Sequence, residues 1–159
     1  GYSGVLIARL LPPGAVLYSV DPDAHMNEIA RELAQMAAVN GSVEFLLATA
    51  AEATEELHRR KILLDFVLID HVKNDYLPAL QMLEGLLNRG ATVVADNVLF
   101  LGTDSYLQYV RGSKFYHSRF VDAALEYTPD GLDGRPLIAD GVEISTYMPN
   151  IGREGFDDL

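Results

Sequence analysis

Two stretches indicate the fold of this chain: Phe66-Val67-Leu68-Ile69-Asp70 and Thr92-Val93-Val94-Ala95-Asp96-Asn97. Each is a short, almost wholly apolar run that ends on an acidic residue. Runs of this kind are typical of strands buried on both faces of a parallel sheet. Apolar residues at helical spacing occupy Tyr76–Leu87 between them, and Arg89-Gly90 provides a stop signal for that helix. The pattern therefore predicts a parallel strand–helix–strand unit.

The same alternation continues toward both ends of the chain. We expect further strands at Val16–Val20 and Val43–Ala48, and further helices at Asp23–Val39, Ala50–Lys61 and Thr103–Val110. Nearer the C-terminus, the strand-like segments Ala123–Tyr127 and Val142–Tyr147 flank a loop rich in glycine, which suggests an antiparallel hairpin. The chain is thus expected to form one α/β domain over residues 1–159, with a doubly wound, mainly parallel sheet closed by this hairpin.

Composition narrows the classes of function. The 159 residues carry a formal net charge of -11, which disfavours binding to a phosphate backbone. There is no cysteine, so thiolate catalysis and cysteine zinc sites are excluded. The best candidate for a membrane span, from Ile62 to Ile69, is broken by Asp65 and is too short to cross a bilayer. We expect a cytoplasmic protein that binds neither nucleic acid nor membrane; the sequence does not indicate its oligomeric state.

Polar side chains stand where the two buried strands end. Ligands of doubly wound folds bind beyond the carboxyl ends of the strands. If the two strands are neighbours, Asp70, Asp96 and Asn97 present oxygen ligands at one sheet edge, and such ligands suit Mg²⁺. The alternative is that these residues simply begin turns or cap helices, and on the pattern alone this is the more common case.

Three further candidates come from position in the chain. Lys73 lies three residues beyond Asp70. Near a dication its ammonium would lose basicity and could serve as a general base. The alternative is an exposed loop lysine, which is the more common case for a single lysine. Asp21 follows a strand and could bind a ribose diol, or it could cap the next helix. The helix that opens at Gly1–Gly4 could hold a carboxylate, but the glycines alone are weak support.

Several segments, in order along the chain, resemble the catechol O-methyltransferase family of S-adenosylmethionine-dependent enzymes. They are Gly1-Tyr2-Ser3, Ala8-Arg9-Leu10-Leu11, Asp70-His71-Val72-Lys73 running on to Tyr76-Leu77-Pro78, Val94-Ala95-Asp96-Asn97-Val98, Tyr109-Val110-Arg111-Gly112-Ser113 and Leu125-Glu126-Tyr127. The resemblance implies a Rossmann-like methyltransferase fold, S-adenosylmethionine and Mg²⁺ as cofactors, and a small catechol as substrate.

The resemblance also implies a role for each site residue. Asp70, Asp96 and Asn97 would bind the metal, and Lys73 would take the proton from the catechol hydroxyl. Glu126 would form a hydrogen bond to the other hydroxyl. The cofactor would be bound by Ser3, Asp21, Asp70 and His71. Asp70, Lys73, Asn97 and Glu126 would therefore also contact the substrate. In the implied reaction the metal lowers the pKa of one hydroxyl, and the resulting phenolate attacks the sulfonium methyl group in line.

Three departures from the family pattern leave alternatives open. Val72 stands where the family has tryptophan, and Ala50-Ala51 stands where it has Ser-Gln. The family has helices and a first strand ahead of the position of Gly1, and this sequence starts after them. In the family pattern that strand should pair with Val16–Val20 and Phe66–Ile69. The chain could thus methylate another diol-bearing molecule, or it could be a catalytically weak member acting as a binding module. The 159 residues alone are not expected to form a competent enzyme.

Overall fold

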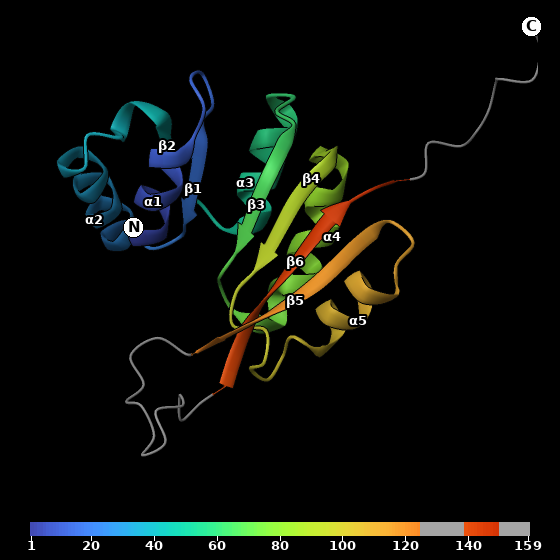
Figure 1. Ribbon diagram of the computed structural model, residues 1–159. Helices are drawn as coiled ribbons and strands as arrows, with labels where there is room; N and C mark the ends of the chain where they lie inside the picture. Colours follow the sequence, from blue (N-terminus) through green and yellow to red (C-terminus); the bar gives the residue numbers. More distant parts are fainter. Residues whose placement is uncertain (125–138, 150–159) are drawn as a thin grey trace, which may run out of the picture. The chain divides into compact units, whose positions relative to one another are not determined.

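The computed structural model describes residues 1–124 and 139–149, and the chain divides into two compact units (Figure 1). The first unit spans residues 1–60 and the second begins at residue 61. Each unit has its own sheet, so each is described by itself. No helix in the described ranges is both long and apolar enough to cross a membrane.

The first unit packs three helices with a two-stranded parallel sheet. Its elements are α1 (Tyr2–Leu10), β1 (Leu17–Asp21), α2 (Ala24–Met36), a 3-10 turn (Asn40–Ser42), β2 (Val43–Leu47) and α3 (Ala50–Arg59). The strands β1 and β2 pair in parallel from Leu17 opposite Val43 to Asp21 opposite Leu47. Side chains cap two of the helices: Asp23 accepts from two main-chain N–H groups of α2, and Thr49 and Glu52 form a capping box on α3.

The second unit contains a four-stranded mixed sheet in the order β3-β4-β6-β5. Its elements are β3 (Leu64–Ile69), a 3-10 turn (Lys73–Asp75), α4 (Tyr76–Leu83), a 3-10 turn (Glu84–Leu86), β4 (Leu87–Ala95), α5 (Asp104–Gly112), β5 (Tyr116–Ala124) and β6 (Ala139–Tyr147). The pairing of β3 with β4 is parallel, whereas β6 runs antiparallel to both β4 and β5. The C-terminal hairpin therefore inserts its second strand next to β4.

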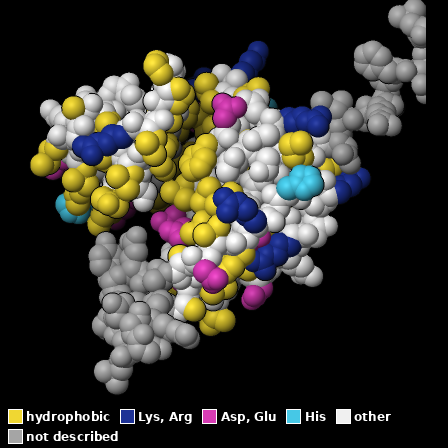
Figure 2. All heavy atoms as spheres, in the orientation of Figure 1, with side chains coloured by type: hydrophobic (Ala, Val, Ile, Leu, Met, Phe, Trp, Pro, Cys, Tyr) yellow, Lys and Arg dark blue, Asp and Glu magenta, His cyan; other side chains and the backbone are white. Residues whose placement is uncertain are grey.

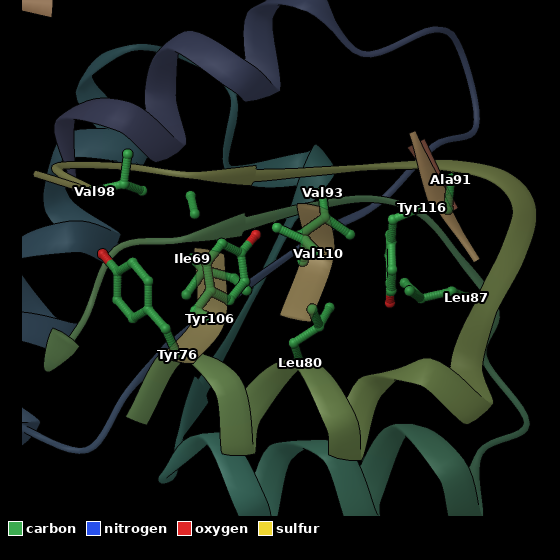
Figure 3. Close-up of a cluster of buried hydrophobic side chains, with 11 residues drawn as sticks. Ile69, Tyr76, Leu80, Leu87, Ala91, Val93, Val98, Tyr106, Val110 and Tyr116 are labelled. Atoms are coloured by element: carbon green, nitrogen blue, oxygen red, sulfur yellow. The ribbon is translucent and has the colours of Figure 1, made fainter. Parts of the chain in front are cut away.

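The core of the second unit lies between β4 and the helices α4 and α5. Figure 3 shows Leu80 reaching from α4 toward Val93 of β4 and Val110 of α5, and all three side chains are fully buried. Tyr76 and Tyr106 complete this cluster with an edge-to-face contact between their rings. Burial of each large apolar side chain stabilises the folded state by about 1.5–3 kcal/mol, so this cluster firmly holds α4 and α5 to the sheet.

The structure confirms the predicted α/β fold class and the antiparallel hairpin, but it corrects some boundaries. The helix expected over Tyr76–Leu87 ends at Leu83, and Gly90, taken as its stop signal, lies inside β4. Leu83, Leu86 and Leu87 continue the helical spacing, while Gly90 adopts a φ of 88° where the β3–β4 register shifts. The strand expected at Ala123–Tyr127 begins at Tyr116; residues 125–127 lie outside the described residues.

Both sheets expose apolar side chains and have a strand paired on one side only. Within the described ranges β1 pairs only with β2, and β3 only with β4. Val20 of β1 is 39% exposed and Phe66 of β3 is 42% exposed, and Figure 2 shows hydrophobic side chains at the surface of the chain. Unpaired strand edges and exposed apolar surface are usually covered in native proteins. The expectation that a preceding strand pairs with β1 and β3 stays a prediction.

Candidate functional site

The parallel pairing of β3 and β4 brings the two predicted strand ends together. Ile69, the last residue of β3, lies opposite Ala95, the last residue of β4. The N–H of Asp96 donates to the carbonyl oxygen of Ile69 at 3.1 Å, which extends the ladder by one step. Asp70 and the pair Asp96-Asn97 therefore leave the sheet at the same edge, where ligands of this fold class bind.

The ammonium group of Lys73 lies among the oxygen atoms of this edge. Its Nζ donates to Oδ1 of Asn97 at 3.3 Å and to the main-chain oxygen of Asp96 at 3.4 Å. It also forms an ion pair with Oδ1 of Asp70 at 3.5 Å. The carboxylate of Asp96 turns back on its own loop, where Oδ1 accepts from the N–H of Asn97 at 2.8 Å. Three residues predicted as metal ligands thus contribute an oxygen near one cation, although Asp96 does so through its main chain.

Tyr76 holds Lys73 in this position. The phenolic oxygen accepts from Nζ of Lys73 at 2.6 Å, and the hydroxyl donates to the main-chain oxygen of Asp96 at 2.9 Å. Burial raises the pKa of Tyr76, and the nearby charges of Asp70 and Asp96 raise it further, so the hydroxyl keeps its proton at neutral pH. Sequence analysis missed this contact, because Tyr76 carries the apolar spacing of α4 and shows no separate polar signal.

Asn97 is held by backbone and side chain together. Its φ is 51°, in the left-handed region that asparagine tolerates better than most residues. Its Nδ2 donates to Oδ2 of Asp140 at 2.7 Å, which leaves Oδ1 directed at Lys73. Asp140 is 2% exposed and was not among the predicted site residues. It belongs to one of three Asp-Gly pairs between residues 130 and 141, and such a pair by itself indicates no more than a turn.

The site is open to solvent on one side. The side chain of Asp70 is 45% exposed and that of Lys73 is 22% exposed. The ring of His71 lies 5.2 Å from the ring of Tyr76. Burial lowers the pKa of His71 despite an opposing hydrogen bond to the main chain of Asp75, so its ring is neutral at pH 7. A neutral ring at this edge can pack against a flat, uncharged group.

The donor set fits a small hard cation. The oxygens around Nζ of Lys73 are carboxylate, amide and carbonyl oxygens, the types that Mg²⁺ takes from proteins. Lys73 itself acts as a stand-in cation, because its charge already lies where these oxygens converge. In the part of the chain that the structure describes, no three His, Cys, Asp or Glu side chains gather to hold a metal. The oxygens that face Lys73 are a carboxylate oxygen of Asp70, the amide oxygen of Asn97 and the main-chain oxygen of Asp96, and Mg²⁺ sites are commonly completed by water.

The remaining predicted site residues lie elsewhere. Ser3 is exposed in the first turn of α1, and Asp21 is the last residue of β1, so both belong to the first unit. Oδ1 of Asp21 accepts from the N–H of Asp23, while Asp23 itself caps α2. Asp21 is therefore not the helix cap, and a role in ligand binding stays open to it. Glu126 lies outside the described residues.

Gly102 lets the loop after β4 approach the segment that carries Lys73. Its φ is 102°, and a Cβ at this position would lie 2.4 Å from Oδ1 of Asn74 and 3.3 Å from the main-chain N of Asn74. We expect Gly102→Ala to lower the free energy of unfolding by about 1–3 kcal/mol through backbone strain and this clash. Urea denaturation of the chain measures this change.

Gly112 provides the matched control for that substitution. It ends α5, its φ lies outside the left-handed region, and nothing lies within 4 Å of a Cβ built on it. Gly112→Ala should leave the stability unchanged or raise it by up to about 1 kcal/mol, since alanine favours helix. Equal destabilisation by both substitutions would contradict the tight approach at Gly102.

Comparisons with known proteins identify the family of the chain. A family model described as O-methyltransferase matches residues 1–110. Catechol O-methyltransferase of Mus musculus is 34% identical over 152 residues, covering 93% of this chain and 54% of that protein. Catechol O-methyltransferase B of Danio rerio is 38% identical over 139 residues, which cover 84% of this chain and 53% of that protein. Transmembrane O-methyltransferase of Homo sapiens is 38% identical over 152 residues, which cover 92% of this chain and 50% of that protein. The chain spans about half the length of these curated relatives.

Solved structures show the same fold at lower identity. An O-methyltransferase from Bacillus cereus in complex with S-adenosylhomocysteine superposes with a TM-score of 0.79 at 19% identity, covering 92% of this chain and 69% of that one. An O-methyltransferase from Streptomyces achromogenes in complex with S-adenosylmethionine gives a TM-score of 0.79 at 23% identity, covering 94% and 69%.

Proposed function

The chain belongs to the O-methyltransferase family, and on this premise we propose that it serves in the Mg²⁺-dependent transfer of a methyl group from S-adenosylmethionine to one hydroxyl of a catechol. The observation that carries the proposal is the convergence of oxygen atoms from Asp70, Asp96 and Asn97 on the ammonium of Lys73. The catechol O-methyltransferases among the relatives support the substrate class. The proposal thus assigns metal binding and proton transfer to residues that lie together at one sheet edge.

Asp70, Asp96 and Asn97 would hold the metal in this proposal. When bound, Mg²⁺ would supply positive charge that lowers the pKa of a coordinated hydroxyl. The side chain of Asp70 is more exposed than that of Lys73, so it is accessible to a ligand from solvent. Asn97 contributes an uncharged oxygen whose direction is set by its bond to Asp140. With the metal bound by these residues, the solvent-exposed side of the site would be left for the substrate.

Lys73 would act as the general base. The proton of the substrate hydroxyl moves to Nζ, and the phenolate oxygen then attacks the methyl carbon of the sulfonium. S-adenosylmethionine, when bound, would supply the methyl group, and the electron pair of its carbon–sulfur bond would stay on sulfur. Tyr76 keeps Nζ close to the ligand oxygens, because its hydroxyl bridges Lys73 and Asp96.

The cofactor and the second substrate hydroxyl are assigned through the family likeness. Ser3 would bind the methionine carboxylate, Asp21 the ribose and His71 the adenine, with Asp70 also facing the cofactor. The neutral ring of His71 supports its part in this assignment. Glu126 would accept a hydrogen bond from the hydroxyl that is not methylated. The expectations of a cytoplasmic location and of no nucleic-acid or membrane partner stay predictions.

A second diol-bearing substrate is favoured by one observation. Val72, which stands where the family has tryptophan, is 64% exposed. A valine offers far less flat area than an indole for stacking against an aromatic ring. A valine here would leave more room for a substrate than the tryptophan of the family pattern, so a bulkier vicinal diol is the second candidate.

The proposal is tested by ligand stabilisation and turnover in two proteins. One is the chain as it stands, and the other is a fusion in which whatever part of mouse catechol O-methyltransferase lies ahead of its match to this chain is joined before residue 1. In the fusion, S-adenosylmethionine at 100 times its Kd should add about 2.7 kcal/mol to the free energy of unfolding. Catechol should be methylated with Mg²⁺ and not with EDTA, whereas phenol, which lacks the second hydroxyl, should be a poor substrate.

The outcomes of that assay separate the rival functions. Methylation of catechol at an equal rate in EDTA would contradict the metal-dependent mechanism. Stabilisation by S-adenosylmethionine without turnover of any vicinal diol would favour a binding module over an enzyme. Turnover by the unfused chain at the rate of the fusion would contradict the expectation that residues 1–159 alone are not competent.

A further inference from the structure

Asp140 is a buried carboxylate that no sequence pattern or comparison assigns to the site. It lies at the start of β6 and is 2% exposed. Its Oδ1 accepts from the N–H groups of Gly141 at 2.8 Å and Leu99 at 3.3 Å, and its Oδ2 accepts from Nδ2 of Asn97 at 2.7 Å. A buried carboxylate is costly unless it is hydrogen-bonded, and here both oxygens have donors.

These bonds fix which way the amide of Asn97 points. An ionised carboxylate only accepts hydrogen bonds, so it selects the NH₂ end of the amide. The carbonyl end is then directed away from Asp140, and Oδ1 lies 3.3 Å from Nζ of Lys73. A flipped amide would set its oxygen against the carboxylate and its NH₂ against the ammonium, and both contacts would be repulsive.

The strand that carries Asp140 is firmly anchored. Glu143, three residues along β6, is fully buried and receives two hydrogen bonds from Arg111 of α5, at 2.9 and 2.7 Å. The carbonyl oxygen of Gly141 accepts from the N–H of Val98 at 3.0 Å, which ties β6 to the loop that follows Asn97. Asp140 is thus presented by a rigid element, as a positioning contact requires.

We infer that Asp140 is a positioning residue that orients the amide of Asn97 so that its oxygen faces the metal. The inference rests on the proposed function, because Asn97 is a metal ligand only within that proposal. Groups that orient metal ligands typically change metal affinity by about 10–100-fold when they are replaced. Asp140 acts only through Asn97 and does not itself touch the proposed metal.

An exchange of the two side chains tests the inference. In Asp140→Asn, the new Oδ1 can still accept from Leu99 and Gly141, but the new NH₂ group faces the NH₂ of Asn97. The amide of Asn97 should then flip and turn a donor toward the metal. Adding Asn97→Asp should restore the arrangement, because the carboxylate introduced at position 97 would accept from the amide introduced at position 140 with one oxygen and present the other to the metal. The double variant has the same net charge as the wild type.

The readout is Mn²⁺ binding to the full chain of residues 1–159, followed by electron paramagnetic resonance of the free ion. We expect Asp140→Asn to weaken binding by about 10–100-fold, and the double variant to recover most of that loss. Wild-type affinity in Asp140→Asn would overturn the inference. A double variant as weak as Asp140→Asn would also overturn it, since the carboxylate would then have a merely structural role.

A second measurement separates this inference from the metal assignment. The side-chain NH₂ resonance of Asn97, identified by its loss in Asn97→Asp, should shift in Asp140→Asn without any metal present, and an unchanged resonance would overturn the orienting contact. The resonance could shift while the wild-type and Asp96→Ala chains bind Mn²⁺ with equal affinity. That result would contradict the metal assignment, and with it the role of Asp140 in orienting a metal ligand. A shift together with weaker Mn²⁺ binding in both single variants supports the inference.

Discussion

Asp96→Ala is expected to abolish Mg²⁺-dependent methylation of catechol by the fusion. The substitution removes the carboxylate that the proposal assigns to the metal and that accepts from the N–H of Asn97 in this structure, while it keeps the main-chain oxygen near Lys73. The loss in turnover should exceed the effect of about 10–100-fold that is typical of a group that only orients a ligand. Steady-state kinetics over a range of Mg²⁺ concentrations measure it, and the affinity for S-adenosylmethionine should change little.

Two further substitutions make the result on Asp96 specific. Asp96→Asn keeps an oxygen for the N–H of Asn97 but removes the charge, so it should preserve the fold while still losing most metal-dependent turnover. Asp122→Ala removes an exposed carboxylate from β5 of the same unit and should leave turnover within about twofold, as for most surface substitutions. Turnover near wild type in Asp96→Ala at saturating Mg²⁺ would refute the metal assignment.

The placement of Asp70 and Asp96-Asn97 could be predicted because it depends on short-range features. Each follows an apolar run, and consecutive strands joined by a helix usually pair in parallel as neighbours. The register of Ile69 with Ala95 then follows, so the residues just beyond meet at one edge. Strand periodicity carries no information about side-chain direction at the strand end, so the turn of the Asp96 carboxylate toward its own loop was not foreseen.

The contacts that complete the site depend on longer-range structure. Asp140 reaches Asn97 because β6 inserts antiparallel beside β4, which brings together two residues that are 43 positions apart in the chain. Such pairing is set by packing, which a local pattern does not describe. Tyr76 reaches Lys73 and Asp96 because one turn of 3-10 helix precedes α4 and aims its first residue back at the sheet edge.

Boundary errors in the second unit have a common cause. Leucines at helical spacing run past the end of α4 into β4, and periodicity alone cannot separate a buried helix end from a buried strand. Gly90 was interpreted as a helix stop, yet its positive φ serves a register shift within β4. The predicted site does not depend on these boundaries. Asp70 and Asp96 follow the C-terminal ends of β3 and β4, which were predicted correctly, whereas the errors concern the N-terminal end of β4.

Lys73→Met is expected to lower kcat for catechol methylation by the fusion about 10²–10⁴-fold, the usual cost of removing a general base. Methionine keeps most of the length and the apolar stem of lysine but has no amine to accept the hydroxyl proton. The substrate would still bind through the metal, so KM for catechol should change far less than kcat. A rise in KM with an unchanged kcat would mean that Lys73 contributes to binding and not to proton transfer.

Lys73→Arg distinguishes a base from a mere positive charge. Nζ of Lys73 lies within 3.5 Å of oxygens from Asp70 and Asn97, so its charge alone could organise the site. Arginine keeps that charge but is never deprotonated in proteins, and it should therefore fail as a base nearly as completely as methionine. Lys114→Met, which changes an exposed lysine of the same unit, should leave kcat unaltered. If Lys73→Arg retained near wild-type turnover while Lys73→Met did not, the ammonium would act through its charge, and proton abstraction would have to be assigned to another group.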